Sequence, residues 1–249
     1  MYKKGLYTIV SNEPLTPAVY RMVLEGDTQY ITRSGQFVNI ELEGKFLRRP
    51  ISVCDYDATT LTIIYKVVGS GTEQMRQMER GKQLDILTGL GNGFSTENEA
   101  QRPLLVGGGV GVPPMYNLCK RLLSEGKQPR VVLGFNTQSE VFYKAEFEAL
   151  GVDVYVATAD GSMGIKGFVT DAIREAGIEF DYLYTCGPLP MLRPCTTLPP
   201  SPRSSASRSA WVVALVPAWV ARARPNMATS VSARMVPYLK ERRLYGKAL

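Results

Sequence analysis

The first part of the chain alternates apolar and polar residues in short segments, and glycines separate several of them. We expect strands at residues 6–11, 19–25, 37–42, 47–53, 60–67 and 83–88. Short strands at this spacing predict a small antiparallel β-barrel over residues 1–98. One short helix interrupts the strands, and Thr72 is placed to cap its N-terminus, with Glu73 in the first turn.

From about residue 102 the pattern changes to strands that alternate with helices. Buried-strand runs are expected at residues 103–106, 130–135, 152–157 and 182–186, with helices at 114–123, 145–150 and 171–176. This alternation is typical of a parallel sheet with crossover helices, so residues 99–193 are predicted to form a Rossmann-like α/β domain. The expected fold class is therefore a β-barrel followed by an α/β domain.

After Arg193 neither a helical nor a strand period is sustained, and Pro217 interrupts the apolar run at 211–221. We expect an irregular segment over residues 194–249. It carries nine Lys and Arg residues against one acid, whereas the preceding 193 residues carry 20 against 22. A basic tail of this kind leaves nucleic-acid binding open as an alternative, although our prediction is no nucleic-acid partner.

Composition narrows the class of protein further. The N-terminus leads straight into a strand-like pattern without a signal segment, and no apolar run approaches the ~20 residues of a membrane helix. The four cysteines are far apart and there is no histidine, so no metal site is predicted within the two domains. We expect a cytoplasmic protein with no membrane partner.

Two segments of the barrel are suited to holding a phosphate-bearing cofactor. Arg49-Pro50-Ile51-Ser52 ends a strand, where an arginine can pair with a diphosphate and a serine can donate to a ring nitrogen. Gly69-Ser70-Gly71-Thr72 precedes a helix, where backbone N–H groups favour an anion. The alternatives are an exposed arginine at a strand end and an ordinary glycine turn.

A second candidate site lies in the α/β domain. Gly107-Gly108-Gly109-Val110-Gly111 follows a strand and opens a helix that Pro113-Pro114 suits. The spacing is not a strict G-x-G-x-x-G. Cys186 ends the last convincing strand, at the sheet edge where ligands bind, and could equally be a core thiol. Two cofactor sites in series predict a protein that moves electrons between carriers.

In this order, the motifs resemble those of the ferredoxin-reductase-like flavoproteins, and most closely the electron-transfer subunits of class 1B dihydroorotate dehydrogenases. The resemblance covers residues 1–193. It is also carried by Gly91-Asn92-Gly93-Phe94, Asp160-Gly161-Ser162-Met163-Gly164 and Cys186-Gly187-Pro188-Leu189-Pro190-Met191. It implies that FAD contacts Arg49, Pro50, Ile51, Ser52, Ile64, Tyr65, Lys66, Gly71 and Thr72. It implies that NAD(H) lies over Gly107, Gly108, Gly109 and Gly111 and near Cys186.

The resemblance also implies a reaction and a partner. Electrons would pass from an FMN-containing, dihydroorotate-oxidising catalytic subunit to the FAD of this subunit and then to NAD+, within a heterotetramer that serves pyrimidine biosynthesis. No acid–base catalytic residue is required, since the cofactors carry the chemistry. A related NAD(P)H:ferredoxin or sulfide oxidoreductase subunit and a flavin-binding remnant are the alternatives, and the choice between NAD and NADP stays open.

The chain departs from the family at its C-terminus. The family holds a [2Fe–2S] cluster there with four cysteines in a C-x4-C-x2-C…C pattern, but no cysteine follows Cys195. Read in the neighbouring frame, codons for residues 210–221 permit M-G-C-G-V-G-A-C-L-G-C, in which Trp211-Val212 and Trp219-Val220 each force a glycine. A frame change near residue 193 would account for the lost cysteines and the basic tail, and a genuinely divergent tail is the alternative.

Overall fold

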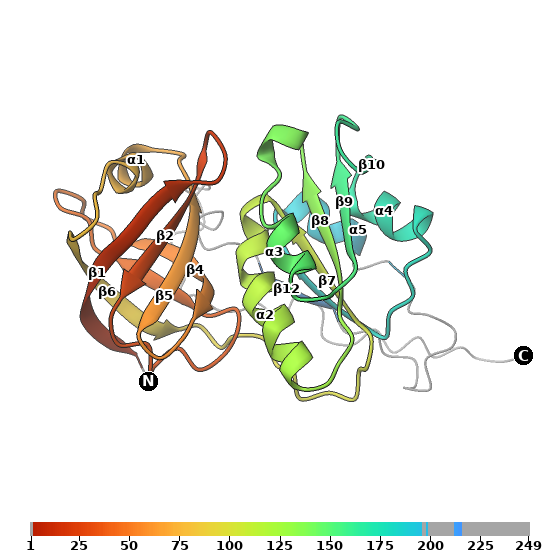
Figure 1. The fold of residues 1–249 in the computed structure, drawn as a ribbon, viewed down its shortest axis with the longest axis horizontal. Helices are drawn as coiled ribbons and strands as arrows, with labels where there is room; N and C mark the ends of the chain where they lie inside the picture. The colour runs from red at the N-terminus through yellow and green to blue at the C-terminus, as the bar shows by residue number, and fades with distance from the viewer. Residues whose placement is uncertain (1, 196–197, 199–211, 216–249) are drawn as a thin grey trace, which may run out of the picture.

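A computed structural model describes residues 2–195, 198 and 212–215 of the chain. The first domain is a closed β-barrel (Figure 1). The strands are β1 (Lys3–Pro14), β2 (Val19–Glu25), β3 (Phe37–Ile40), β4 (Arg49–Tyr56), β5 (Thr60–Lys66) and β6 (Gln83–Leu90). They pair antiparallel in the order β1-β2-β5-β4-β3-β6, and β1 closes the barrel on β6. The predicted antiparallel barrel is confirmed.

The barrel closes around side chains that the two-residue period of each strand points inward. Fully buried members include Ile9, Met22, Ile40, Leu61 and Ile86. The helix α1 (Ser70–Arg76) packs against this core through Met75.

The predicted role of Thr72 as the helix cap is wrong by three positions. The helix begins at Ser70, so Thr72 lies within its first turn. The Thr72 hydroxyl instead accepts from the backbone N–H of Val68 at 2.9 Å and of Gly69 at 3.3 Å. It therefore holds the preceding loop from inside the helix, as the third residue of a capping box does.

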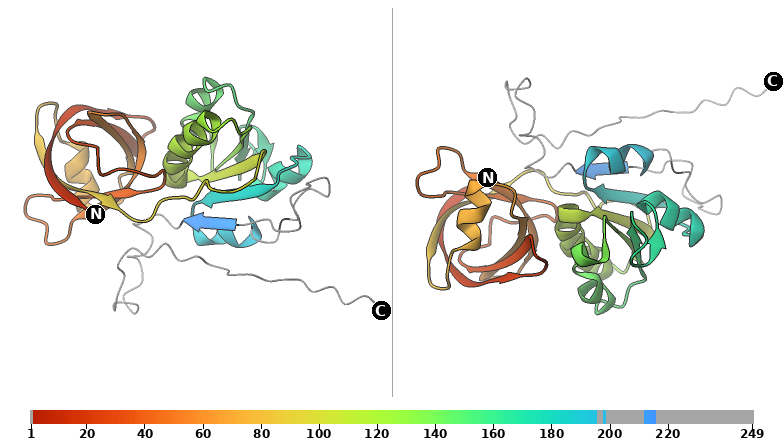
Figure 2. Two further views of the ribbon diagram at one scale, coloured as in Figure 1. Left: turned by 90° about the horizontal axis from the view of Figure 1, so that it is seen from below. Right: turned by 90° about the horizontal axis from the view of Figure 1, so that it is seen from above.

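The second domain is a parallel sheet with helices on both faces. Its strands are β7 (Pro103–Gly108), β8 (Arg130–Phe135), β9 (Val154–Thr158), β10 (Ile165–Lys166), β11 (Tyr182–Cys186) and β12 (Val212–Leu215), in the order β10-β9-β8-β7-β11-β12. The helices α2 (Val112–Ser124) and α3 (Lys144–Glu148) cover the face toward the barrel, whereas α4 (Val169–Glu175) and α5 (Leu189–Cys195) cover the other (Figure 2). Two short 3-10 turns, η1 (Gly109–Gly111) and η2 (Gln138–Glu140), complete it. The predicted α/β domain is confirmed.

Three strands and α-helices of this domain, besides the two 3-10 turns, were not expected from the sequence. The short strand β10 and helix α5 lack a readable period because one has two residues and the other contains Pro194. The expectation of no strand after residue 193 is wrong at β12, which pairs parallel with β11 from Leu183↔Val212 to Cys186↔Leu215. Pro194 and Cys195 also lie in α5, and apart from these residues, Leu198 and β12 the predicted irregular segment lies outside the described residues.

The two domains share one apolar core. Val19, Cys54 and Ile64 of the barrel belong to the same buried cluster as Met115 and Leu118 of α2. Figure 1 shows α2 between the barrel and the sheet. None of the helices in the described part of the chain is long and apolar enough to span a bilayer.

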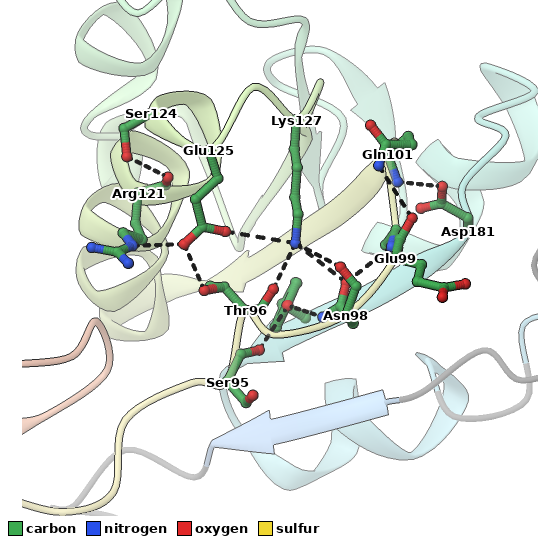
Figure 3. A network of polar contacts seen from close by, with 12 residues as sticks. Ser95, Thr96, Asn98, Glu99, Gln101, Arg121, Ser124, Glu125, Lys127 and Asp181 are labelled. Carbon is green, nitrogen blue, oxygen red and sulfur yellow. Dashed lines mark hydrogen bonds and ion pairs between the residues drawn. The ribbon is translucent and has the colours of Figure 1, made fainter.

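The segment that joins the domains is fixed by a buried lysine (Figure 3). The Lys127 ammonium donates to the carbonyl of Thr96 at 2.6 Å and of Asn98 at 3.1 Å. Asn98 in turn donates to the Tyr184 hydroxyl at 2.8 Å, and that hydroxyl donates to the carbonyl of Ser95 at 2.9 Å. The linker is thus held to the sheet and to the end of α2 rather than spanning the domains freely.

Candidate functional site

The strands β4 and β5 present one outer face of the barrel to the second domain. Along β4, Ile51 points into the barrel core, whereas Cys54 packs in the core shared with the second domain. Along β5, Tyr65 points inward and Ile64 outward. Lys66 also faces the second domain, and its ammonium lies 3.4 Å from Glu140 Oε1. The strand alternation therefore places part of the predicted flavin segment on this face.

The structure brings Arg49 and Gly71 together, although they lie in different elements. A Cβ at Gly71 would lie 2.2 Å from Arg49 Nε and 2.6 Å from Arg49 Nη2. Only glycine therefore leaves room for the guanidinium at this position. The arginine also donates to the carbonyl of Leu47. A permanent positive charge at the N-terminal turn of α1 is suited to a diphosphate.

The remaining predicted flavin residues divide between surface and core. Pro50 and Ser52 are half-buried, whereas Ile51 and Tyr65 are buried in the barrel. The Tyr65 hydroxyl donates to Asn12 Oδ1 at 2.9 Å, and burial raises its pKa. A flavin contact from Ile51 or Tyr65 would therefore have to come from the backbone. Thr72 is committed to the loop before α1, as described above.

The glycines of the second candidate site have different structural roles. A Cβ at Gly111 would lie 2.1 Å from the Cys186 carbonyl oxygen, and one at Gly107 would lie 2.9 Å from Val112 Cα. Those two glycines let η1 and α2 approach the strand ends closely. At Gly108 the nearest atom would be Met191 Sδ, the end of a flexible side chain.

Gly109 is the glycine with open space beside it. Its φ is +51°, in the left-handed region, and a Cβ there would meet nothing within 4 Å. It follows the carboxyl end of β7, which has β8 on one side and β11 on the other, so the chain connections switch sides of the sheet here. Ligands of open α/β sheets bind at such a switch point.

Cys186 lies beside this turn but is a core residue. It is 1% exposed, packs in the shared core, and burial raises its pKa. It pairs with Gly107 in the sheet register. The thiol is therefore neutral, and the part of Cys186 nearest the turn is its carbonyl.

The second candidate site lies against the barrel, because η1 contacts the barrel strand β5. Sequence reasoning missed the polar residues that join the domains here, including Asp55, Asn117 and Lys120. Nothing in their local sequence marks them, since they meet only when β4 packs on α2.

The donor sets fit a dinucleotide and a flavin but not an iron–sulfur cluster. Arg49 beside a glycine and the open turn at Gly109 both suit phosphate groups. The four cysteines, by contrast, lie singly on β4, α2, β11 and α5, all buried and free. Among the described residues, no three His, Cys, Asp or Glu side chains form a group that could hold a metal. Beyond Cys195 the sequence offers no thiolate.

Known proteins resemble the chain over the same region. Residues 105–196 match the oxidoreductase NAD-binding domain family. The structure of an NADH-dependent reduced ferredoxin-NADP oxidoreductase is 33% identical with a TM-score of 0.70, and the match covers 77% of this chain and 71% of that one. The flavohem-like FAD/NAD binding domain of a Vibrio cholerae nitric oxide dioxygenase shares the fold at 20% identity and a TM-score of 0.69, covering 86% of this chain and 100% of that domain.

Curated relatives give a more specific match. The dihydroorotate dehydrogenase B (NAD(+)) electron transfer subunit of Bacillus mycoides is 46% identical over 201 residues, which are 78% of this chain and 77% of the relative. The corresponding subunit of Bacillus cereus strain G9842 is 45% identical over the same shares. The chain therefore belongs to the family of electron transfer subunits of dihydroorotate dehydrogenase B (NAD(+)), an oxidoreductase family.

Proposed function

We propose that the chain binds FAD on the β4–β5 face of the barrel and NAD(H) at the η1 turn, and passes electrons between them. The main support is the contact between η1 and β5, which brings the glycine turn of one domain against the candidate flavin strands of the other. The match to an NAD-binding family over residues 105–196 supports the nucleotide half.

The protein's own residues bind and orient in this proposal. Arg49 would hold the diphosphate of FAD, and the glycines at Gly107 of β7 and Gly111 of η1 would let the nucleotide turn pack closely. Gly109 would leave room for the phosphates of NAD(H). When bound, the flavin and nicotinamide exchange a hydride, and the flavin can also exchange single electrons with other carriers.

The relatives are electron transfer subunits of a dihydroorotate dehydrogenase, so a catalytic subunit is the expected partner. We propose that this partner oxidises dihydroorotate on FMN. This sequence lacks the cysteines for the cluster that the family resemblance implies between that FMN and this flavin. We propose that a frame change near residue 193 accounts for that lack.

The first experiment tests both cofactor sites. The purified protein is expected to carry FAD or to take it up, and anaerobic NADH is expected to bleach the flavin band. Gly109→Val should slow the bleaching by blocking nucleotide approach while FAD stays bound. Gly126→Val is the matched control, since Gly126 has φ +76°, equally open surroundings, and a place at the other end of α2. Equal bleaching rates in the two variants would place the nucleotide elsewhere.

The second experiment tests the partner and the tail. With the catalytic subunit added, dihydroorotate should reduce NAD+ only when the gene carries the alternative frame after codon 193, whereas NADH-to-dye activity should survive in both forms. Sequencing the gene across codons 190–245 checks the frame independently. Full dihydroorotate activity from the sequence as given would contradict this account of the tail.

A second candidate function rests on the 33% identical ferredoxin-NADP oxidoreductase structure. A related NAD(P)H:ferredoxin or sulfide oxidoreductase subunit would have the same two domains. Such a subunit would pass electrons from NAD(P)H to its own electron acceptor, such as a ferredoxin, at full rate without a dihydroorotate-oxidising partner. That result would favour the second function over the first.

A further inference from the structure

A group of polar side chains crosses the interface between the domains at the end of β4. The Lys120 ammonium lies 2.6 Å from Asp55 Oδ2 and 2.9 Å from Asp55 Oδ1. Asn117 Nδ2 donates to Asp55 Oδ1 at 3.1 Å. Asn117 and Lys120 are three residues apart on α2, so they lie on one face of the helix and reach the same carboxylate.

Asn117 is buried in this group, and both ends of its amide are engaged. Its Oδ1 accepts from the Ser34 hydroxyl at 2.5 Å, while its Nδ2 donates to Asp55. Turning the amide over would set its oxygen against the Asp55 carboxylate, so the observed orientation is the favourable one. The Ser34 carbonyl also accepts from the Phe94 N–H at 2.7 Å, which ties the linker to the same point. Every buried polar group here has a partner, as a specific interface requires.

The group joins the two elements that carry the candidate cofactor residues. The strand β4 begins at Arg49 and ends next to Asp55, whereas α2 begins directly after the glycine turn η1. The shared apolar core presses β4 and α2 together but is non-directional. The hydrogen bonds that Asn117 and Lys120 donate to Asp55, by contrast, fix how far α2 slides along β4. Hydride transfer needs its reacting atoms about 3–3.5 Å apart, so it is sensitive to such a slide.

We propose that Asp55 is a positioning residue: by holding Lys120 and Asn117, it sets the register of α2 on β4 and thereby the alignment of nicotinamide on flavin. The inference rests on the proposed function, since it requires both cofactors to bind where described. It predicts that loss of the carboxylate slows flavin reduction without weakening either binding step.

The test compares four variants with the wild-type holoprotein: Asp55→Asn, Asp55→Lys, Lys120→Asp, and the exchanged pair Asp55→Lys with Lys120→Asp. Each is assayed for FAD content, for NADH affinity, and for the rate of flavin reduction at saturating NADH in anaerobic stopped flow. The primary isotope effect with deuterated NADH verifies that hydride transfer is being timed. Asp153→Asn is the matched control, because Asp153 pairs with Arg130 in the second domain, away from the barrel.

The expected result separates rate from binding. Asp55→Lys sets two ammonium groups together, and we expect about a tenfold slower hydride transfer with FAD content and NADH affinity unchanged. The exchanged pair should recover most of the rate, because it restores an ion pair at the same position and Asn117 can turn its amide. Asp153→Asn should match the wild type.

Two results would overturn the inference: a wild-type rate in Asp55→Lys, or an exchanged pair no faster than Asp55→Lys alone. If Asp55→Lys does not fold, Asp55→Asn decides, since its amide has the same shape. We expect it to be about threefold slower, as loss of a partly exposed ion pair allows, and an unchanged rate would refute the inference. A wild-type protein that binds no FAD, or whose flavin ignores NADH, would instead refute the proposed function.

Discussion

Gly71→Ala is expected to weaken FAD binding while leaving the fold as stable or slightly more so. The added Cβ would lie 2.2 Å from Arg49 Nε, so the guanidinium has to move away. The guanidinium is the end of a flexible side chain, so moving it costs the fold less than moving backbone atoms would. Gly71 lies within α1, where alanine is favoured over glycine by about 0.5–1 kcal/mol. Stability and cofactor affinity should therefore change in opposite directions.

The size of the binding effect follows from the contact that is displaced. A hydrogen bond to a charged group contributes about 1.5–3 kcal/mol, and about 1.4 kcal/mol corresponds to a tenfold change in affinity. Because the displaced arginine can still reach part of its ligand, we expect the FAD dissociation constant to rise about tenfold, toward the lower end of that range. Apoprotein titrated with FAD, followed by flavin fluorescence, gives this constant, and urea unfolding gives the stability.

A double-mutant cycle shows whether the effect acts through Arg49. Arg49→Ala should weaken binding at least as much as Gly71→Ala, and adding Gly71→Ala to it should then change little, since the two act through one group. Arg48→Ala is the matched control, because Arg48 pairs with Asp85 on the barrel surface. Additive losses from Gly71→Ala and Arg49→Ala, or unchanged affinity in either, would refute the assignment of Arg49 to the cofactor.

Three further predictions concern stability and metal content. Gly111→Ala places a Cβ 2.1 Å from the Cys186 carbonyl oxygen, which is backbone and cannot yield, so we expect a loss of about 1–3 kcal/mol in urea unfolding. Lys127→Met leaves the carbonyls of the linker without their donor and should cost about 1–3 kcal/mol in the same assay, whereas Lys144→Met, which breaks an exposed pair within α3, should cost under about 1 kcal/mol. The protein as given should contain no [2Fe–2S] cluster, and two irons per chain with a rhombic electron paramagnetic resonance signal after reduction would contradict this.

Patterns within a single segment predicted the architecture well. The barrel strands have a two-residue period, and strands alternate with helices after residue 102. Both patterns indicate which face of an element is buried, and the structure buries those faces. The strand β12 was missed because only its pairing with β11 defines it as a strand. Four residues of β12 carry no period of their own and are placed by the register with β11.

The sequence identified residues of the candidate site but not the role that each of them has. The sequence singled out Gly107, Gly109 and Gly111 together, but only the fold separates the one with open space from the two that allow close packing. Likewise, Tyr65 stands in the predicted flavin segment while its side chain points into the barrel. Asp55 could not be found from the sequence, since its partners lie more than 60 residues away.

The apolar core shared by the domains limits how ligands can reach the interface. Separating the barrel from α2 would expose Val19 and Ile64 to water, and two such side chains correspond to about 3–6 kcal/mol. That is a large share of the ~5–15 kcal/mol by which a domain is stable. We therefore expect the barrel and the α/β domain to stay packed against each other during turnover. A nucleotide that arrives and leaves at each turnover has to pass through the edge where Gly109 lies, with the two halves staying closed on each other.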